Sequence, residues 1–142
     1  MQIKDIMTKE VVFVNQEDTI EKAAQLMKDY NVGSIPVCDG QKIVGIVTDR
    51  DITLRCVSQG KDVKQVVSDV MTNNPVTAHP LTDVQEAARM MSDQQVRRLP
   101  ITDHNNLVGI VALGDLAVDP KSKNNAGNAL KDISVPSNPS VS

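Results

Sequence analysis

A polar segment at residues 45–51 has the residue types that could bind a nucleotide. An apolar, strand-like stretch runs into Thr48, Asp49, Arg50 and Asp51. A hydroxyl followed by the unpaired N–H groups of a helix start can bind a phosphate, because the helix dipole favours an anion there. The Asp51 carboxylate can accept two hydrogen bonds from a ribose diol. The same spacing is also that of a capping box, in which Thr48 and Asp51 only stabilise a helix start.

The segment occurs twice because the chain contains an internal repeat. Residues 6–52 align without a gap on residues 70–116, and roughly a third of the positions are identical. In the second copy Ala112 replaces the threonine, whereas Asp115 keeps the acid. A capping box needs the hydroxyl as well as the acid. Retention of the acid alone therefore weighs against capping as its only role.

A pair of arginines distinguishes the second copy from the first. Arg97 and Arg98 precede Leu99 and Pro100, where the first copy has glycine and serine at 33 and 34. Two guanidinium groups without a neighbouring acid could bind phosphates, since each offers a rigid set of donors. A solvated surface pair is the alternative interpretation.

The spacing of apolar residues predicts an amphipathic helix in each copy. Apolar residues within 20–27 recur at i, i+3, i+4 and i+7, and those of 84–91 repeat the pattern. Asp18 with Glu21, and the residues at 82 and 85, have the spacing of a capping box before these helices.

Short strands and a second helix follow in each copy. Apolar segments flanking polar turns predict four strands, at 34–38, 43–48, 98–102 and 107–112. A second helix should run from near Thr48 towards Gln59, and its counterpart should begin near Gly114. Pro36 and Pro100 lack an amide donor, so we expect them at a sheet edge or where the backbone leaves the ladder.

Composition limits the classes of partner. The chain has 142 residues, a formal charge of -3 and only two aromatic residues, Phe13 and Tyr30, so a bound base would have to lie between aliphatic side chains. No basic run exceeds the arginine pair, which argues against nucleic acid. No apolar run approaches the roughly 20 residues that span a bilayer, and the first residues lack an apolar targeting region, so we expect a cytoplasmic protein without a membrane partner.

The cysteines and histidines do not suggest a metal site. Cys38 and Cys56 occupy non-equivalent positions of the two copies, and we expect free, packed thiols. His79 and His104 fall in predicted turns and not in a cluster of ligands. No required cofactor is expected.

The repeat, the segment at 45–51 and the segment at 96–100 together resemble a pair of cystathionine-β-synthase (CBS) domains, the Bateman module, and most closely its small stand-alone members. The resemblance covers residues 3–118. It implies an α/β (α+β) fold of two CBS repeats, at 1–60 and 61–118, each with a small sheet flanked by two helices and related by a pseudo-twofold axis. The polar tail at 119–142 has helical spacing that predicts a short helix at 126–133.

The resemblance also implies two clefts between the repeats for adenine nucleotides or adenosyl compounds. The candidate ligands are AMP, ADP, ATP, S-adenosylmethionine and NAD. In the first cleft, phosphate and ribose would be held by Thr48 and Asp51, with Arg97 and Arg98 reaching the phosphates from the other copy. In the second, Asp115 would hold the ribose. We expect one competent site, or one strong and one weak, because Ala112 lacks the hydroxyl.

Further residues complete the expected ligand-binding set. Ser34, Ile35 and Pro36 would lie near the base of the second cleft, and backbone groups near Thr8, Val12, Thr72 and Val76 would face adenine edges. The remaining expected ligand-binding residues are Val47, Asp49, Arg50 and Pro100.

Three functions are compatible with these patterns. The first is a non-catalytic sensor that binds an adenosyl ligand and acts through a homodimer, formed by helix faces as in other CBS pairs, or through an unidentified effector protein. The second is a ligand-free dimerisation or protein-interaction module. The third, a magnesium-dependent nucleotide hydrolase using Asp49 and Asp51, is disfavoured because no nucleophile with a base and no further acid or histidine cluster accompanies them.

Overall fold

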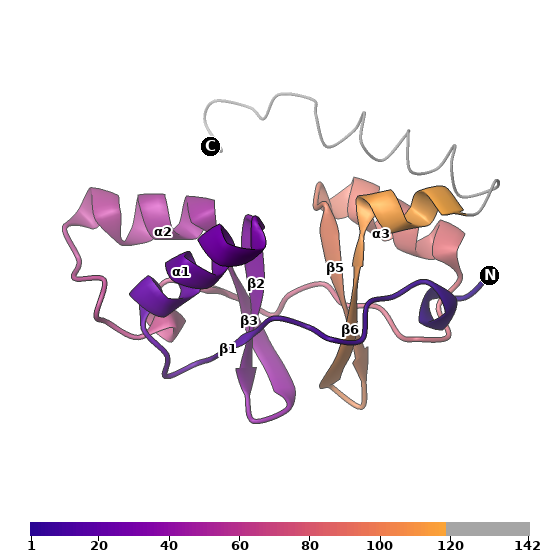
Figure 1. Ribbon diagram of the computed structural model, residues 1–142, viewed down its shortest axis with the longest axis horizontal. Coiled ribbons are helices and arrows are strands. Elements are labelled where there is room, and N and C mark those ends of the chain that lie inside the picture. The colour runs from indigo at the N-terminus through magenta and orange to yellow at the C-terminus, as the bar shows by residue number, and fades with distance from the viewer. Residues whose placement is uncertain (119–142) are drawn as a thin grey trace. The chain divides into compact units, whose positions relative to one another are not determined.

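The computed structural model describes residues 1–118, whose secondary structure follows the internal repeat (Figure 1). The α-helices in this range are α1 (Ile20–Tyr30), α2 (Asp49–Arg55) and α3 (Val84–Gln94). Its strands are β1 (Val14–Asn15), β2 (Ser34–Asp39), β3 (Lys42–Thr48), β4 (Thr72–Asn73), β5 (Arg98–Asp103) and β6 (Asn106–Ala112). Its 3-10 turns are Ile3–Asp5, Val57–Gln59, Val67–Asp69 and Leu113–Val118. The predicted tail, with its helix at 126–133, lies outside the described residues.

The two predicted amphipathic helices are confirmed as α1 and α3, but their capping residues lie one position later than predicted. The hydroxyl of Thr19 accepts a hydrogen bond from the N–H of Lys22 at 3.1 Å. The carboxylate of Asp83 accepts one from the N–H of Gln85 at 2.9 Å. Each side chain thereby satisfies an amide that has no partner within the helix.

The residues predicted as caps stabilise the preceding turns instead. Asp18 accepts from the N–H of Asn15 at 2.9 Å, and Thr82 accepts from the N–H of His79 at 3.0 Å. Each copy offers two adjacent polar residues before its helix, and spacing alone does not show which of them caps it.

The four predicted hairpin strands are confirmed to within one residue as β2, β3, β5 and β6. The β2–β3 turn has Gly40 at φ 63°, and the β5–β6 turn has His104 and Asn105 at φ 51° and 66°. Such positive φ values are typical of tight hairpin turns. Pro36 pairs with Ile46 of β3 at a position beyond the short β1, which pairs with β2 only at residues 37 and 38.

The second helix differs between the copies. α2 ends at Arg55, four residues before the predicted end near Gln59, and the separate 3-10 turn Val57–Gln59 then ends at Gly60, which has a φ of 69°. The counterpart near Gly114 is a 3-10 turn, Leu113–Val118, and not an α-helix. Ala112 has no side-chain acceptor for the amides of this turn, in contrast to Thr48 at the start of α2.

The described residues form two compact units that do not coincide with the two repeats. Unit 1 contains residues 1–9, 76–101 and 109–118, whereas unit 2 contains residues 10–75 and 102–108. In unit 2 the strand order is β1-β2-β3, with β4 also paired to β3, and Lys42 of β3 pairs with Asn106. Each unit therefore includes the first residues of the other repeat as an arm: residues 1–9 in unit 1 and residues 65–73 in unit 2.

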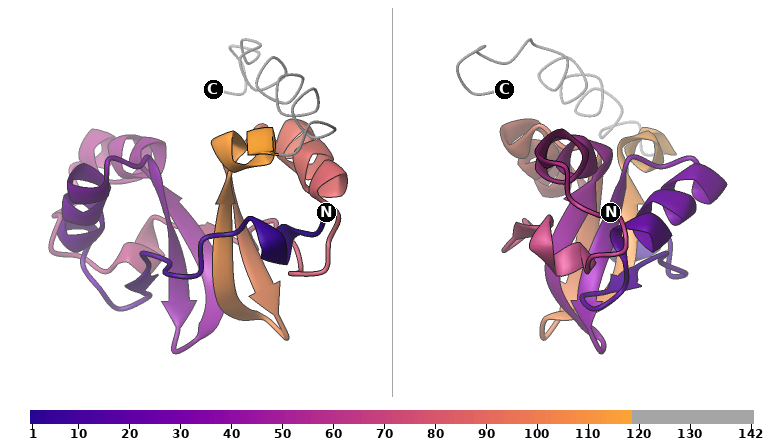
Figure 2. Two further views of the ribbon diagram at one scale, coloured as in Figure 1. Left: turned by 45° about the vertical axis from the view of Figure 1, so that its right-hand side comes forward. Right: turned by 90° about the vertical axis from the view of Figure 1, so that its left-hand side faces the viewer.

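Equivalent hydrogen bonds attach each arm to its unit. In unit 1 the N–H of Ile3 donates to the carbonyl of Thr82 at 2.8 Å, and in unit 2 the N–H of Val67 donates to the carbonyl of Asp18 at 2.7 Å. Thr8 then pairs with Ile110 of β6 in an isolated bridge, where the N-terminal arm passes across that strand in Figure 2. In unit 2 the matching pair is β4 on β3.

The core of unit 2 is aliphatic and includes residues from the arm. Fully buried side chains from α1, β2 and β3 pack with Val67 and Val70, which lie in the 65–73 segment. Unit 1 buries Ile3 of its arm completely, and its other fully buried side chains include Met91, Leu99, Ile101 and Leu116. The arms are thus structural parts of the units and not connecting loops.

No helix within residues 1–118 is long and apolar enough to cross a bilayer. Cys38 and Cys56 are free and buried, as expected from their positions in the sequence.

Burial predicts that both cysteines resist alkylation in the native protein. Burial raises the pKa of the Cys38 thiol to about 11, so the reactive thiolate is scarce at pH 8. Cys56 has no exposed surface. We expect iodoacetamide at pH 8 to label neither thiol in native protein and both in urea, as measured by intact mass. Rapid labelling of native Cys38 would contradict its burial.

Two glycines should be sensitive to substitution because the arms pass close to them. A Cβ at Gly45 would lie 2.6 Å from Met71 Sδ and 2.8 Å from the Thr72 carbonyl oxygen. At Gly109 the corresponding distances to Met7 and Thr8 are 2.6 and 3.1 Å.

Gly45→Ala and Gly109→Ala should each lower the free energy of unfolding by about 1–3 kcal/mol in urea titrations, because the arm must shift. Gly114→Ala is the control, since no atom of the described residues lies within 4 Å of the place that a Cβ would take there. It should change stability by less than about 0.5 kcal/mol. Equal effects at Gly45 and Gly114 would contradict the close approach.

Candidate functional site

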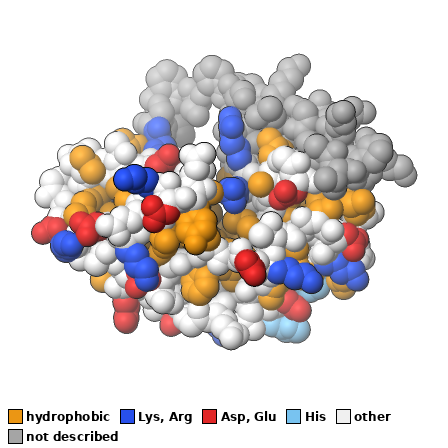
Figure 3. Space-filling view, in the orientation of Figure 1, with side chains coloured by type: hydrophobic (Ala, Val, Ile, Leu, Met, Phe, Trp, Pro, Cys, Tyr) orange, Lys and Arg blue, Asp and Glu red, His pale blue; other side chains and the backbone are white. Residues whose placement is uncertain are grey.

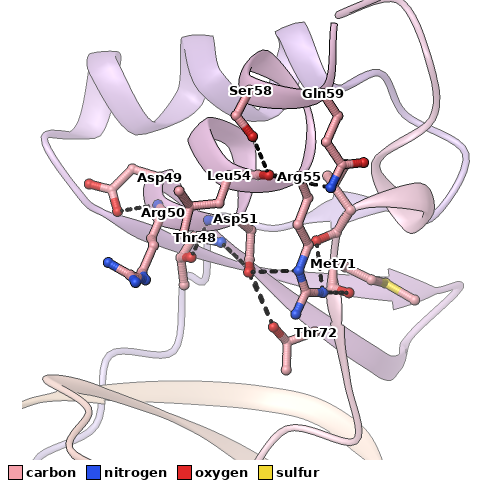
Figure 4. Close-up of polar contacts among 11 residues, drawn as sticks. Thr48, Asp49, Arg50, Asp51, Leu54, Arg55, Ser58, Gln59, Met71 and Thr72 are labelled. Carbon is pink, nitrogen blue, oxygen red and sulfur yellow. Dashed lines mark hydrogen bonds and ion pairs between the residues drawn. The ribbon is translucent and has the colours of Figure 1, made fainter. Parts of the chain in front are cut away.

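The start of α2 is a complete capping box formed by Thr48 and Asp51 (Figure 4). Thr48 Oγ1 accepts a hydrogen bond from the N–H of Asp51 at 2.9 Å, and Asp51 Oδ2 accepts one from the N–H of Thr48 at 3.0 Å. The capping interpretation is therefore confirmed. A ligand role is compatible with it, because the hydroxyl still has a proton to donate and the carboxylate has a second oxygen.

The amides of the first turn of α2 are all occupied. The N–H of Asp49 donates to the carbonyl of Gly33 at 2.9 Å, and the N–H of Arg50 donates to Asp49 Oδ1 at 2.8 Å. The third amide, of Asp51, donates to Thr48. None of these three amides is therefore free to bind a phosphate in this structure. A phosphate near this turn would have to be bound by side chains.

Asp51 is the buried charged residue of unit 2, with 9% of its surface exposed. The hydroxyl of Thr72 donates towards both carboxylate oxygens at 3.4 Å. Arg55 forms an ion pair with it, the Nε–Oδ1 distance being 3.8 Å. Arg55 was not among the residues predicted from the sequence, although the i, i+4 spacing of acid and base on one helix was a signal for it.

The equivalent acid in unit 1, Asp115, keeps one contact of the capping box. Asp115 Oδ2 accepts a hydrogen bond from the N–H of Ala112 at 2.8 Å, which reproduces half of the capping box. The N–H of Leu113 donates to the carbonyl of Arg97 at 2.8 Å, as Asp49 does to Gly33. The acid thus has a structural partner without the hydroxyl. Its retention in the second copy is not by itself an argument for ligand binding.

The residues expected to hold the base lie mainly in the cores of the units. Ile35 and Val47 face each other in the β2–β3 ladder and are 1% and 0% exposed. The side chains of both residues pack in the core of unit 2, so neither presents a surface to a base. Pro36 and Pro100 are also buried, whereas Ser34 is half-buried.

The other expected residues are divided between the units. Arg97 is exposed and Arg98 half-buried in unit 1, and neither guanidinium group has a hydrogen-bond or ion-pair partner among residues 1–118. The N–H of Thr8 is already bonded to the carbonyl of Ile110 at 2.9 Å, so it is not free for an adenine edge. Val76 is half-buried in the same unit.

A hollow of about 420 Å³ opens in unit 2 between the 10–13 segment and α1. Val12 is the residue of the expected set that lines it. Both aromatic residues of the chain, Phe13 and Tyr30, lie on its wall and are 43% and 58% exposed. The aliphatic composition of the chain gave no reason to expect them at one hollow.

Charges of both signs are interspersed on the face shown in Figure 3, without a broad basic surface. Within the described part of the chain, no three His, Cys, Asp or Glu side chains are placed to hold a metal ion.

Two regions of the chain, residues 3–57 and 67–118, match the family model of the CBS domain. The CBS domain-containing protein YhcV of Bacillus subtilis (strain 168) is 50% identical over 132 residues, which cover 93% of this chain and 94% of that protein. Both the family and its tandem arrangement are the ones expected from the sequence.

Solved structures show the same fold. The structure of Hypoxic Response Protein I with two coordinated zinc ions has a TM-score of 0.76 at 31% identity, covering 83% of this chain and 98% of that one. CBSX2 in complex with AMP has a TM-score of 0.72 at 28% identity, covering 80% and 91%.

The CBS domain pair of MJ0100 in complex with 5'-methylthioadenosine and S-adenosyl-L-methionine also has a TM-score of 0.72, at 30% identity, covering 83% of this chain and 98% of that one. The duplicated sequence, the mixed α/β fold and the two matched regions lead to one conclusion: this chain belongs to the CBS-domain family, as a tandem pair.

Proposed function

We propose that this protein is a non-catalytic regulatory module that binds an adenine nucleotide or a related adenosyl compound. AMP, ADP, ATP, S-adenosylmethionine and NAD are the candidate ligands. Support comes from two structural neighbours, one solved with AMP and one with 5'-methylthioadenosine and S-adenosyl-L-methionine. Binding would be transmitted through a homodimer or through a separate effector protein. To do so, the ligand must bind one conformational or oligomeric state more tightly than the other, because only a difference in affinity shifts an equilibrium.

The buried carboxylate of Asp51 carries the proposal. It lies at the junction of β3 and α2, and beyond its capping bond its contacts are long: 3.4 Å to the Thr72 hydroxyl and 3.8 Å to Arg55. A ribose diol could supply shorter bonds to the same oxygens, since a carboxylate has about four acceptor positions. Asp51 is accordingly the proposed ribose ligand of the first site.

Side chains are the proposed phosphate ligands. The first-turn amides of α2 are occupied, so the proposed phosphate donors are side chains: the Thr48 hydroxyl and, as the family resemblance implies, the guanidinium groups of Arg97 and Arg98. The second site has Asp115 but Ala112 in place of the hydroxyl. We therefore propose that it binds phosphorylated ligands more weakly than the first.

A ligand-free interaction module is the second candidate. The complete capping box shows that Thr48 and Asp51 have a structural use without a ligand. Leu54 and Val57, on and just after α2, are 44% and 63% exposed, and such apolar side chains fit a helix-mediated homodimer. A hydrolase is less well supported, because the cation beside Asp51 is Arg55 and Asp49 is bonded to the amide of Arg50.

A thermal-shift series tests the first candidate against the second. Wild-type protein and Asp51→Asn are compared with AMP, ADP, ATP, NAD, S-adenosylmethionine and GTP. At a hundredfold excess over its dissociation constant, a ligand adds about 2.7 kcal/mol of stability, which is a rise of several degrees. We expect the rise with adenine compounds and not with GTP.

Asp51→Asn should keep the fold, because the amide oxygen can still accept from Thr48, but it should weaken adenosyl ligands by about tenfold or more in calorimetric titrations. Unchanged affinity in this variant would exclude Asp51 as a ligand. No shift in the wild type with any adenine compound at millimolar concentration would favour the interaction module.

Arg98→Ala tests the phosphate ligands separately. A charge-assisted bond to phosphate matters only for phosphorylated ligands, so the affinity for ATP should fall about tenfold and that for adenosine by less than about twofold. Arg89→Ala is the control, because Arg89 pairs with Glu86 on the surface of α3 and should affect neither ligand. Equal losses for ATP and adenosine would contradict a phosphate role.

A further inference from the structure

Arg55 contacts Asp51 and the arm of unit 2 at the same time (Figure 4). Its Nε lies 3.8 Å from Asp51 Oδ1. Its NH1 group donates to the carbonyl of Met71 at 3.1 Å and approaches the carbonyl of Val70 at 3.5 Å. A planar guanidinium group can satisfy these acceptors together because its donors point in several fixed directions.

The two side chains of this ion pair differ in their exposure to solvent. The side chain of Asp51 is 11% exposed, whereas that of Arg55 is 50% exposed. A carboxylate with little access to water depends on nearby donors and cations to stabilise its charge. The hydroxyl of Thr72, in the same arm, donates towards both of its oxygens. The arm and α2 therefore meet at this carboxylate.

We propose that Arg55 is a positioning residue for the Asp51 site and couples its occupancy to the order of the 70–73 arm segment. Arg55 does not have to touch the ligand. It holds the Asp51 carboxylate and the end of the Val67–Asp69 turn in one arrangement, and a ligand that needs that arrangement stabilises the arm as well. The ligand half of this inference rests on the proposed function.

The second copy does not repeat this arginine. The position that matches Arg55 in the repeat is occupied by Asp119, an acid. Asp115 of unit 1 accepts its hydrogen bond from a backbone amide. The inference is therefore made for the first site alone, on the basis of Arg55.

Hydrogen exchange of the free protein tests the contact with the arm. In Arg55→Ala the backbone amides of residues 70–73 should exchange about tenfold faster than in the wild type, because the side chain that bonds the two carbonyls is removed. Arg89→Ala is the matched control, since it removes another helix-surface arginine with one ion pair. Wild-type exchange in Arg55→Ala would overturn the inference whether or not a nucleotide binds.

Titration with AMP tests the coupling. Arg55→Ala should bind AMP about tenfold more weakly than the wild type, and Arg55→Lys, which keeps the charge but not the planar donors, should fall between them. AMP should slow exchange at residues 70–73 in the wild type and not in Arg55→Ala. Equal AMP affinities with an identical effect on the arm would overturn the positioning role and leave the proposed function intact.

Failure of AMP and of the other adenosyl ligands to bind the wild type would overturn the proposed function and the coupling together. The exchange comparison between free wild type, Arg55→Ala and Arg89→Ala would then still decide whether Arg55 anchors the arm. The two failures are distinguishable because the first experiment contains no ligand.

Discussion

The reciprocal placement of the two arms is the constraint on which the rest of the structure depends. The arm at the N-terminus is built into the unit that contains the second repeat, and the arm between the repeats is built into the unit that contains the first. Each supplies fully buried side chains, Ile3 in one case and Val67 with Val70 in the other. Small units bury a smaller fraction of their surface than large domains do, so these residues are a considerable part of each core.

The same arrangement connects stability to the candidate site. Thr72 pairs with β3 through its backbone and reaches Asp51 with its hydroxyl, so one arm residue contributes both to the sheet and to the polar cluster. Asp51 has two uses for the same reason. It stabilises the start of α2 as half of a capping box, and its partly buried charge lies where β3, α2 and the arm meet.

Local patterns in the sequence predicted the elements well, whereas packing could not be predicted in the same way. Helical spacing identified α1 and α3, and the hairpin strands lay within one residue of their predicted limits, because periodicity and turn residues are local properties. Met7-Thr8 and Met71-Thr72 are identical in sequence, so nothing in them indicates which sheet each arm joins. The occupation of the α2 amides could not be foreseen either, because it depends on the carbonyl of Gly33, sixteen positions before Asp49.

The exchange of arms has a consequence for how such a chain can arise and diverge. A polypeptide with a single repeat has no second unit that could receive its arm. With two copies, the arm of each repeat supplies buried side chains to the core of the unit that contains the other. When both copies lie in one chain, each arm can still pack in the unit of the other repeat, and the two copies do not have to stay identical in sequence. Thr48 and Ala112 can then differ, and so can Arg55 and Asp119. The reciprocal packing therefore constrains the arms and the strands that they join, and leaves the residues at the starts of the second helices free to differ.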